Sequence, residues 1–272
     1  MRRSRIKAKL ARNEPVLLPL LNLADPAVFE MVSVLGFDGI WLDLEHMGRG
    51  VETAHDLIRA ARVGGADVMA RPAKGEFMRM GRLLEAGAQG ILYPRCDDAA
   101  EAAEVVQWAK FPPVGKRGLS GSGPDMPYCL MDMGRYVEVA NAETFIAIQI
   151  EDRHAVDRAG EIAGVEGVDV LFLGPGDFTL SEGIIGQFDH PIFQRAIERI
   201  AEAASAAGKH WGTLAMSVEM AQQLVEMEAR LICYGEDYEV LRAGYRGIQE
   251  QFARFGFTFH RPLGEAEGSV IL

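Results

Sequence analysis

The stretch from Thr144 to Asp177, TFIAIQIEDRHAVDRAGEIAGVEGVDVLFLGPGD, decides the fold that we expect for this chain. It begins with an apolar run, continues with helical periodicity over Ala155–Ala163, and ends in a second apolar run, Asp169–Gly174. Nearly continuous apolar runs are typical of parallel strands that are buried on both faces, and the segment between two such strands is usually a covering helix. The stretch therefore predicts a strand, a helix and a second, parallel strand.

The same unit recurs along the whole chain. The eight apolar runs are Pro15–Leu20, Gly39–Asp43, Asp67–Arg71, Gly90–Pro94, Thr144–Glu151, Asp169–Gly174, His210–Leu214 and Leu231–Gly235. The stretches with helical periodicity between them include Val51–Val63, Glu76–Ala86, Ala99–Lys110, Phe193–Ala207 and Val218–Glu228. Eight such units in 272 residues predict a single domain, 1–272, with a closed (β/α)8 TIM barrel fold of the α/β class. An open, doubly wound sheet is the alternative, but neither GxGxxG nor GxxxxGK[ST] occurs.

Two segments do not fit the repeat. A long irregular segment at about 111–141 is typical of a lid or an interface element. After the last apolar run, Val240–Arg254 has the pattern of an eighth helix, and a tail follows from about 256 to Leu272.

Composition limits the classes of partner. The chain has 28 Lys and Arg against 39 Asp and Glu, a net charge of −11 and a pI of about 5.1. Nucleic acids and anionic membranes attract basic surfaces, so we expect neither as a partner. The three cysteines, Cys96, Cys129 and Cys233, are far apart and form no CxxC pair, which favours a reducing, cytoplasmic location.

Polar side chains follow several of the predicted strands. In a TIM barrel the chemistry lies at the carboxyl ends of the strands, where side chains from different strands meet. The residues in question are Asp43, Glu45, His46, Arg71, Gln149, Glu151, Gly174, Pro175, Gly176 and Asp177. The pattern as a whole predicts one site at this end of the barrel.

Glu151 and Asp177 follow neighbouring strands, which lie about 4.8 Å apart in a parallel sheet. Two carboxylates that converge repel each other unless a proton or a cation lies between them. Few ligands, all of them oxygen, suit Mg²⁺ or Mn²⁺ with open positions for water and substrate. In the alternative interpretation Asp177 caps a helix that begins near Phe178, and Glu151 pairs with a loop arginine.

His46 and Arg71 are candidates for acid–base chemistry and charge stabilisation. A carboxylate beside an imidazole raises its basicity, and Asp43 and Glu45 directly precede His46. Arg71 could bind a carboxylate or stabilise an oxyanion with its planar guanidinium. The structural alternatives are a histidine without a chemical role and an ion pair of Arg71 with Asp43 that joins the second and third strands. No lysine is expected at a strand end facing the barrel, which argues against Schiff-base chemistry.

The motifs FDGIWLDLEH, ARP, LLEAGAQGILYP, FPPVGKRG, IQIED and VDVLFLGPGDF occur in this order between about Lys9 and Gly244. In these motifs the chain resembles the HpcH/HpaI aldolases, which are class II, metal-dependent pyruvate aldolases. The resemblance implies a barrel of the phosphoenolpyruvate/pyruvate type whose last helix is exchanged between subunits. It also implies a homo-oligomer, a trimer or a hexamer.

The resemblance also implies roles for individual residues. Glu151 and Asp177 match the carboxylates that bind Mg²⁺, Mn²⁺ or Co²⁺, and His46, oriented by Asp43, matches the acid–base residue. Arg71 matches the arginine that stabilises negative charge on the substrate. Residues that match pyruvate-contacting positions are Gln149, Gly174, Pro175, Gly176 and Asp177. Glu85 falls where the family often has an aspartate that tunes the histidine.

The chain departs from the family pattern in three places. Leu44 replaces a common glycine, and Glu85 replaces the commoner aspartate. The loop at 118–128 reads GLSGSGPDMPY and lacks an arginine segment that is common there. We expect that loop to face the aldehyde half of the substrate.

The function that the sequence predicts is a carbon–carbon lyase that reversibly cleaves a 4-hydroxy-2-oxo acid into pyruvate and an aldehyde. Its expected partners are therefore a small oxo acid and an aldehyde. Two alternatives are a related lyase acting on an acyl-CoA or citramalate-type substrate and a catalytically silent oligomeric scaffold. The first alternative should need a basic groove for the CoA phosphates, which an acidic chain does not suggest.

Overall fold

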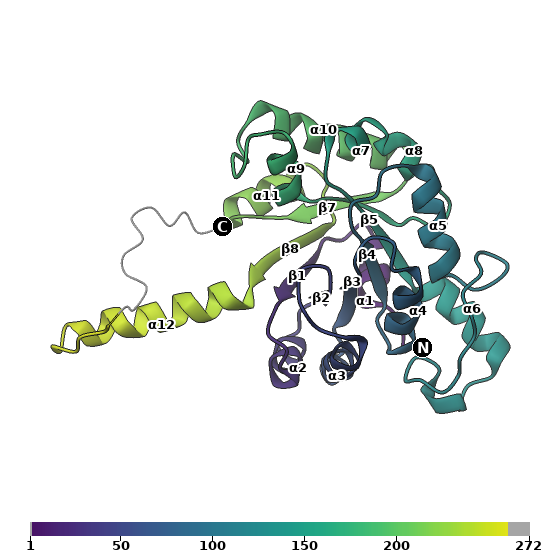
Figure 1. The fold of residues 1–272 in the computed structure, drawn as a ribbon, viewed down its shortest axis with the longest axis horizontal. Coiled ribbons are helices and arrows are strands. Elements are labelled where there is room, and N and C mark those ends of the chain that lie inside the picture. The colour runs from purple at the N-terminus through teal and green to yellow at the C-terminus, as the bar shows by residue number, and fades with distance from the viewer. Residues whose placement is uncertain (1, 261–272) are drawn as a thin grey trace.

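The computed structural model describes residues 2–260 and has a closed, all-parallel barrel at its centre (Figure 1). Each strand pairs with the next along the chain, and the eighth strand pairs with the first. The strands are β1 (Val16–Leu21), β2 (Gly39–Asp43), β3 (Asp67–Arg71), β4 (Gly90–Tyr93), β5 (Phe145–Ile150), β6 (Val170–Leu173), β7 (His210–Leu214) and β8 (Leu231–Glu236). The predicted TIM barrel is confirmed, and each strand lies within its predicted run or differs from it by one residue at an end.

Helices surround the barrel between the strands. They are α1 (Arg5–Leu10), α2 (Pro26–Val34), α3 (Val51–Ala61), α4 (Phe77–Glu85), α5 (Ala99–Ala109), α6 (Met133–Glu143), α7 (Arg153–Asp157), α8 (Ala159–Ala163), α9 (Pro175–Ser181), α10 (Pro191–Ala206), α11 (Val218–Glu226) and α12 (Asp237–Ala253), with a 3₁₀ turn at Pro127–Cys129. The single helix predicted over Ala155–Ala163 is wrong. The structure has two short helices there, because Arg158 between them has the non-helical angles φ −105° and ψ 8°.

Large side chains fill the interior of the barrel, so it is a packed core rather than a channel. Trp41 from β2 and Phe172 from β6 meet edge to face, with ring centroids 5.6 Å apart. At the amino-terminal end, α1 inserts Ile6 and Leu10 into the same cluster. The buried carboxylate of Asp67 holds α1 there, because it accepts hydrogen bonds from the Ser4 hydroxyl and the Ile6 amide.

The segment at 111–141 lies at the amino-terminal end of the barrel, opposite the predicted site. It connects α5 to the start of β5, and such connections end at the amino-terminal rim. Its own small core contains Phe111 and Tyr136, and the Asp125 amide donates to the carbonyl of Glu85, at the end of α4. Within one chain the segment and its 118–128 loop therefore do not cover the predicted site, and the interface element stays a prediction.

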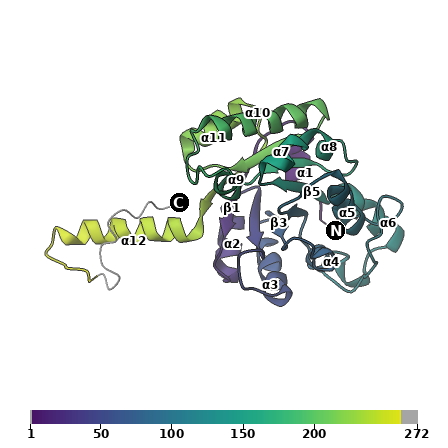
Figure 2. The ribbon, with the colours of Figure 1, turned by 45° about the horizontal axis from the view of Figure 1, so that its top comes forward.

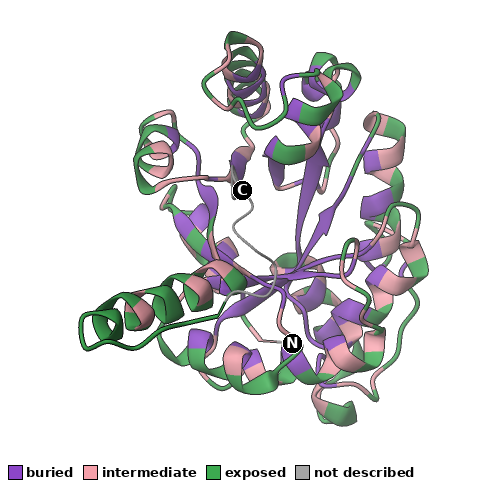
Figure 3. Ribbon diagram, turned by 60° about the vertical axis from the view of Figure 1, so that its left-hand side comes forward, coloured by how far each residue is buried: buried purple, intermediate pink, exposed green. Residues whose placement is uncertain are grey.

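The last helix, α12, does not cover the barrel of its own chain. It projects away from the other helices, as two views show (Figures 1 and 2). Most of its residues are exposed, whereas the barrel strands are almost fully buried (Figure 3). The predicted tail begins with the exposed residues 256–260, and its remainder lies outside the described residues.

Among residues 2–260, no helix is both long enough and apolar enough to cross a lipid bilayer.

Packing between β7 and β8 gives a test of the barrel. Gly212 lies beside Leu231, and a Cβ atom at Gly212 would lie 1.9 Å from the Leu231 carbonyl oxygen. We expect Gly212→Ala to lower the free energy of unfolding by about 3 kcal/mol, because the two strands must move apart. Urea denaturation followed by circular dichroism measures this change.

Gly160→Ala is the matched control. Nothing lies within 4 Å of a Cβ atom at Gly160, which is inside α8. We expect this variant to be as stable as the wild type or more stable by about 0.5–1 kcal/mol, because alanine favours helix. Equal stability of Gly212→Ala and the wild type would contradict the described register.

Candidate active site

The ends of β2 and β3 are joined by a buried ion pair. Asp43 and Arg71 are partners in the strand register, and Nε of Arg71 lies 2.8 Å from Oδ1 of Asp43. Burial acts to raise the pKa of the Asp43 carboxyl, but the hydrogen bond and the charge of Arg71 hold that pKa below its ordinary value. The ion pair that the sequence offered as the structural interpretation of Arg71 is therefore present.

The same Arg71 side chain also reaches the centre of the site. Its Nη1 lies 3.2 Å from Oε2 of Glu45 and donates to Oε1 of Gln149 at 3.4 Å. Its guanidinium stacks over the ring of Trp41, 4.7 Å from the centroid. These contacts fix a buried positive charge among residues from β2, β3 and β5.

His46 lies at the rim, and its side chain is about half exposed. Asp43 holds the backbone at this position, because its carboxylate accepts from the amides of Glu45 and His46 at 3.0 and 3.3 Å. The carboxylate that faces the imidazole belongs to Glu45, with Oε2 3.6 Å from Nε2 of His46. Asp43 thus positions His46 through the main chain, and Glu45 takes the place beside the ring that the resemblance gave to Asp43.

Glu151 follows β5 and is buried beside Gln149, whose amide donates to Oε1 of Glu151 at 2.9 Å. The next strand, β6, leaves room for these two side chains because the residue that follows it is Gly174. A Cβ atom at Gly174 would lie 2.4 Å from Oε1 of Glu151 and 2.8 Å from Nε2 of Gln149. Glycine is thus required at this strand end by the close approach of both polar side chains.

Negative charge around Glu151 is only partly balanced. Burial and the nearby charge of Asp177 raise the pKa of Glu151 to about 7, against an opposing hydrogen bond from the Arg95 amide. Asp177 lies in the first turn of α9, where Gly174 is the residue before the helix. The alternative in which Asp177 caps the helix is therefore wrong.

Arg95, which the sequence analysis missed, lies between these carboxylates. Its Nη2 is 2.7 Å from Oδ1 of Asp177, and its Nε is 3.2 Å from Oε1 of Glu45. The alternative that predicted a loop arginine at this site is correct in part, since the guanidinium pairs with Asp177 and the amide with Glu151. The available signal was its position, two residues after the end of β4.

The donor atoms at this site suit a hard divalent cation. Glu151 and Asp177 offer oxygen atoms, and the charge of Asp177 adds to burial in raising the pKa of the Glu151 carboxyl. Within residues 2–260, no three Asp, Glu, His or Cys side chains converge as a complete ligand set. A cation held by these two carboxylates would therefore complete its shell with water or substrate, as Mg²⁺ commonly does.

The structure does not bring Glu85 to His46 within one chain. Glu85 ends α4, which runs back toward the amino-terminal end of the barrel, and His46 follows the carboxyl end of β2. The surroundings of Glu85 are Arg117 and Asp125 from the segment at 111–141, and burial raises the pKa of its carboxyl. Within one chain Glu85 and His46 therefore lie at opposite ends of the barrel, and the role of Glu85 stays a prediction.

Comparisons with known proteins show the family of this chain. A family model described as HpcH/HpaI aldolase/citrate lyase matches residues 18–243. The chain belongs to this family. The predicted enzyme class, a carbon–carbon lyase of the aldolase type, is therefore confirmed.

Relatives in the HpcH/HpaI family match the chain over most of its length. A 5-keto-4-deoxy-D-glucarate aldolase from Enterobacter is 31% identical, over 92% of this chain and 97% of the relative. A hydroxypyruvate/pyruvate aldolase from Delftia acidovorans is 32% identical, over 87% of both chains. The crystal structure of an HpcH/HpaI aldolase from Desulfitobacterium hafniense has a TM-score of 0.85 and 30% identity, and the match covers 90% of this chain and 96% of that one.

Proposed function

We propose that this family member is a divalent-metal-dependent aldolase that reversibly cleaves a 4-hydroxy-2-oxo acid into pyruvate and an aldehyde. The observation that carries the proposal is the juxtaposition of Glu151 and Asp177 with Gln149, Arg71 and His46 at one end of the barrel. Glu151 and Asp177 would hold Mg²⁺, Mn²⁺ or Co²⁺. The bound cation would supply positive charge next to the oxygen atoms of the oxo acid.

The oxo-acid half of the substrate would lie over Gln149 and the turn Gly174–Asp177. Gln149 is held on both sides, by Arg71 at its oxygen and by Glu151 at its nitrogen. Gly174 and Gly176 present main-chain atoms without side chains, and Pro175 fixes the start of α9.

Bond cleavage needs a base at the C4 hydroxyl and a positive charge near the oxygen that becomes negative. His46 is half exposed at the rim and would take the hydroxyl proton, directly or through water. As the C3–C4 bond breaks, its electron pair passes to the pyruvate half, which becomes an enolate. Arg71 is rigidly held and stabilises the developing negative charge, and a proton added at C3 releases pyruvate.

The two alternatives are less well supported. The relatives named above are aldolases, which favours an aldehyde product over a CoA thioester. In a silent scaffold, nothing would require Glu151 and Gln149 to pack so closely against Gly174 that only glycine fits there.

Removal of either carboxylate should abolish turnover that depends on metal. We expect Glu151→Gln and Asp177→Asn to lower kcat for pyruvate release by about 10³-fold or more, since the cation supplies several kcal/mol of charge stabilisation. Pyruvate can be followed with a coupled dehydrogenase, using a panel of 4-hydroxy-2-oxo acids, in metal-stripped and metal-supplemented protein. Glu182→Gln is the control: Glu182 follows α9 but pairs with Arg153, so its loss should leave kcat unchanged. Full activity of Glu151→Gln would rule out the assignment of the site.

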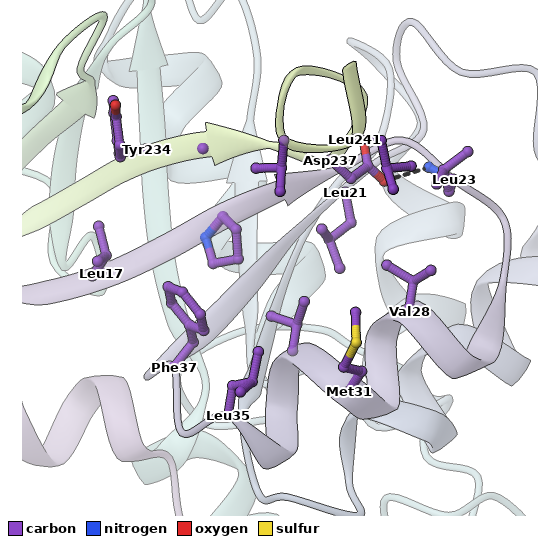
Figure 4. Close-up of a pocket in the computed structure, with 14 residues that line it drawn as sticks. Leu17, Leu21, Leu23, Val28, Met31, Leu35, Phe37, Tyr234, Asp237 and Leu241 are labelled. Atoms are coloured by element: carbon purple, nitrogen blue, oxygen red, sulfur yellow. Dashed lines mark hydrogen bonds between the residues drawn. The ribbon is translucent and has the colours of Figure 1, made fainter. Parts of the chain in front are cut away.

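We also propose that the chain forms a homo-oligomer, a trimer or a hexamer, in which α12 of one copy covers the barrel of another. Tyr238, Leu241, Tyr245, Ile248 and Phe252 are spaced three or four residues apart and form an exposed apolar stripe on one face of α12. Beside the root of α12 lies an apolar groove of about 420 Å³ between β1, α2 and β8. Leu17, Leu21, Val28, Met31, Leu35 and Phe37 line it (Figure 4).

The direction in which α12 leaves the barrel is fixed at its first residue. The buried carboxylate of Asp237 accepts from the amides of Asn22 and Leu23 at 2.9 and 2.7 Å. The groove and the stripe of one chain are therefore both exposed to solvent. Both are apolar, so the stripe of one copy fits the groove of another.

The segment at 111–141 remains a proposed interface element. Three unpaired thiols among the described residues are compatible with the proposed cytoplasmic location.

A charge placed on the stripe should disrupt the oligomer. We expect light scattering to give the wild type a mass several times 29.8 kDa and Ile248→Asp a markedly smaller mass, because the carboxylate would be buried in an apolar interface. Ala243→Asp adds the same charge on the opposite face of α12 and should keep the wild-type mass. A monomeric wild type, or equal masses for both variants, would contradict the exchange of α12.

A further inference from the structure

The backbone of Arg95 is fixed in an unusual conformation. Its φ of 51° lies in the left-handed region, which costs a non-glycine residue roughly 1–2 kcal/mol. Two hydrogen bonds hold it there: its amide donates to Oε2 of Glu151 at 2.8 Å, and its carbonyl accepts from Nζ of Lys74 at 2.7 Å. The side chain of Arg95 therefore leaves from a defined point beside Glu151.

From this point the guanidinium bridges two other elements of the site. It pairs with Asp177 from the first turn of α9 and with Glu45 after β2. The Arg95 side chain is 48% exposed, in contrast to the buried Arg71. The carboxylates of Asp43, Glu45 and Asp177 thus pair with two guanidinium groups, the buried one of Arg71 and the half-exposed one of Arg95.

A cation held by Glu151 and Asp177 would meet Arg95 directly. Oδ1 of Asp177 is engaged in a charge-assisted contact of 2.7 Å with Nη2. A divalent cation on the same oxygen would compete for that contact and would be repelled by the guanidinium charge. Because the side chain is half exposed, it can turn toward water at little cost while its backbone stays in place.

We propose that Arg95 is a positioning residue that acts as the counter-ion of Asp177 and competes with the divalent cation for Oδ1 of that carboxylate. The proposal rests on the metal site assigned above. The Arg95 guanidinium keeps the carboxylates together in the absence of metal, and the same group lowers the affinity of the site for metal. Replacement of Arg95 should therefore destabilise the metal-free protein and strengthen the binding of metal.

Mn²⁺ binding to the full-length, metal-stripped protein, measured by the electron paramagnetic resonance signal of the free ion, tests this competition. We expect Arg95→Met to lower the Kd for Mn²⁺ by about three- to tenfold, because it removes the competing charge and keeps the length of the side chain. Arg95→Lys should give an intermediate Kd, since it keeps the charge and loses the bridging geometry. Arg153→Met is the matched control: Arg153 is exposed and pairs with Glu182, and we expect an unchanged Kd.

Thermal unfolding supplies a second test. A purely structural role of Arg95 would lower Tm equally with and without metal. In EDTA we expect Arg95→Met to melt about 2–4 °C below the wild type, because its carboxylates lose their counter-ion. With saturating Mn²⁺ the difference should vanish or reverse. An equal loss of Tm with and without metal, or a Kd equal to or weaker than that of the wild type, would overturn the role of Arg95. Absence of Mn²⁺ binding by the wild type would instead overturn the metal site itself.

Discussion

Crowding of negative charge at one end of the barrel is the constraint on which the rest of the site depends. Asp43 and Glu45 come from the end of β2, Glu151 from the end of β5 and Asp177 from the start of α9, and the parallel barrel brings them together. Such a cluster persists only if positive charge is supplied nearby. Arg71 supplies it from the buried side and Arg95 from the solvent side, and burial together with the charge of Asp177 still raises the pKa of Glu151. This excess of carboxylates over guanidinium groups favours a cation as the ligand of the cluster.

Most of the barrel could be predicted from the sequence because each parallel strand is buried on both faces. The runs at Gly39–Asp43, Asp67–Arg71 and His210–Leu214 coincide with β2, β3 and β7. The break between α7 and α8 could not be predicted, since the apolar periodicity continues through Arg158 and only its backbone angles differ. The course of α12 is likewise a tertiary property: its apolar stripe indicates a buried face but does not say what covers that face.

The site could be predicted in part. In a TIM barrel, side chains at the carboxyl ends of the strands meet at one rim. This rule correctly predicted the location of Arg71, Gln149, Glu151 and Asp177, because a strand fixes the position and direction of the residues at its end. Arg95 was missed because the placement of its side chain depends on a left-handed backbone, and an arginine in the sequence does not predict that conformation. Glu85 and the 118–128 loop were placed by resemblance alone, and the direction of the chain puts both at the other end of the same barrel.

The central claim, that a cation held by Glu151 and Asp177 permits formation of a pyruvate enolate, can be tested without knowing the aldehyde. Proton NMR in D₂O follows the loss of the pyruvate methyl signal as its protons exchange for deuterium. Metal-stripped protein is compared with protein supplied with Mg²⁺, and samples supplied with Mn²⁺ or Co²⁺ are chelated before the spectrum is recorded. The account predicts exchange that requires metal and is absent in Glu151→Ala. Exchange at the same rate without metal, or in that variant, would contradict it.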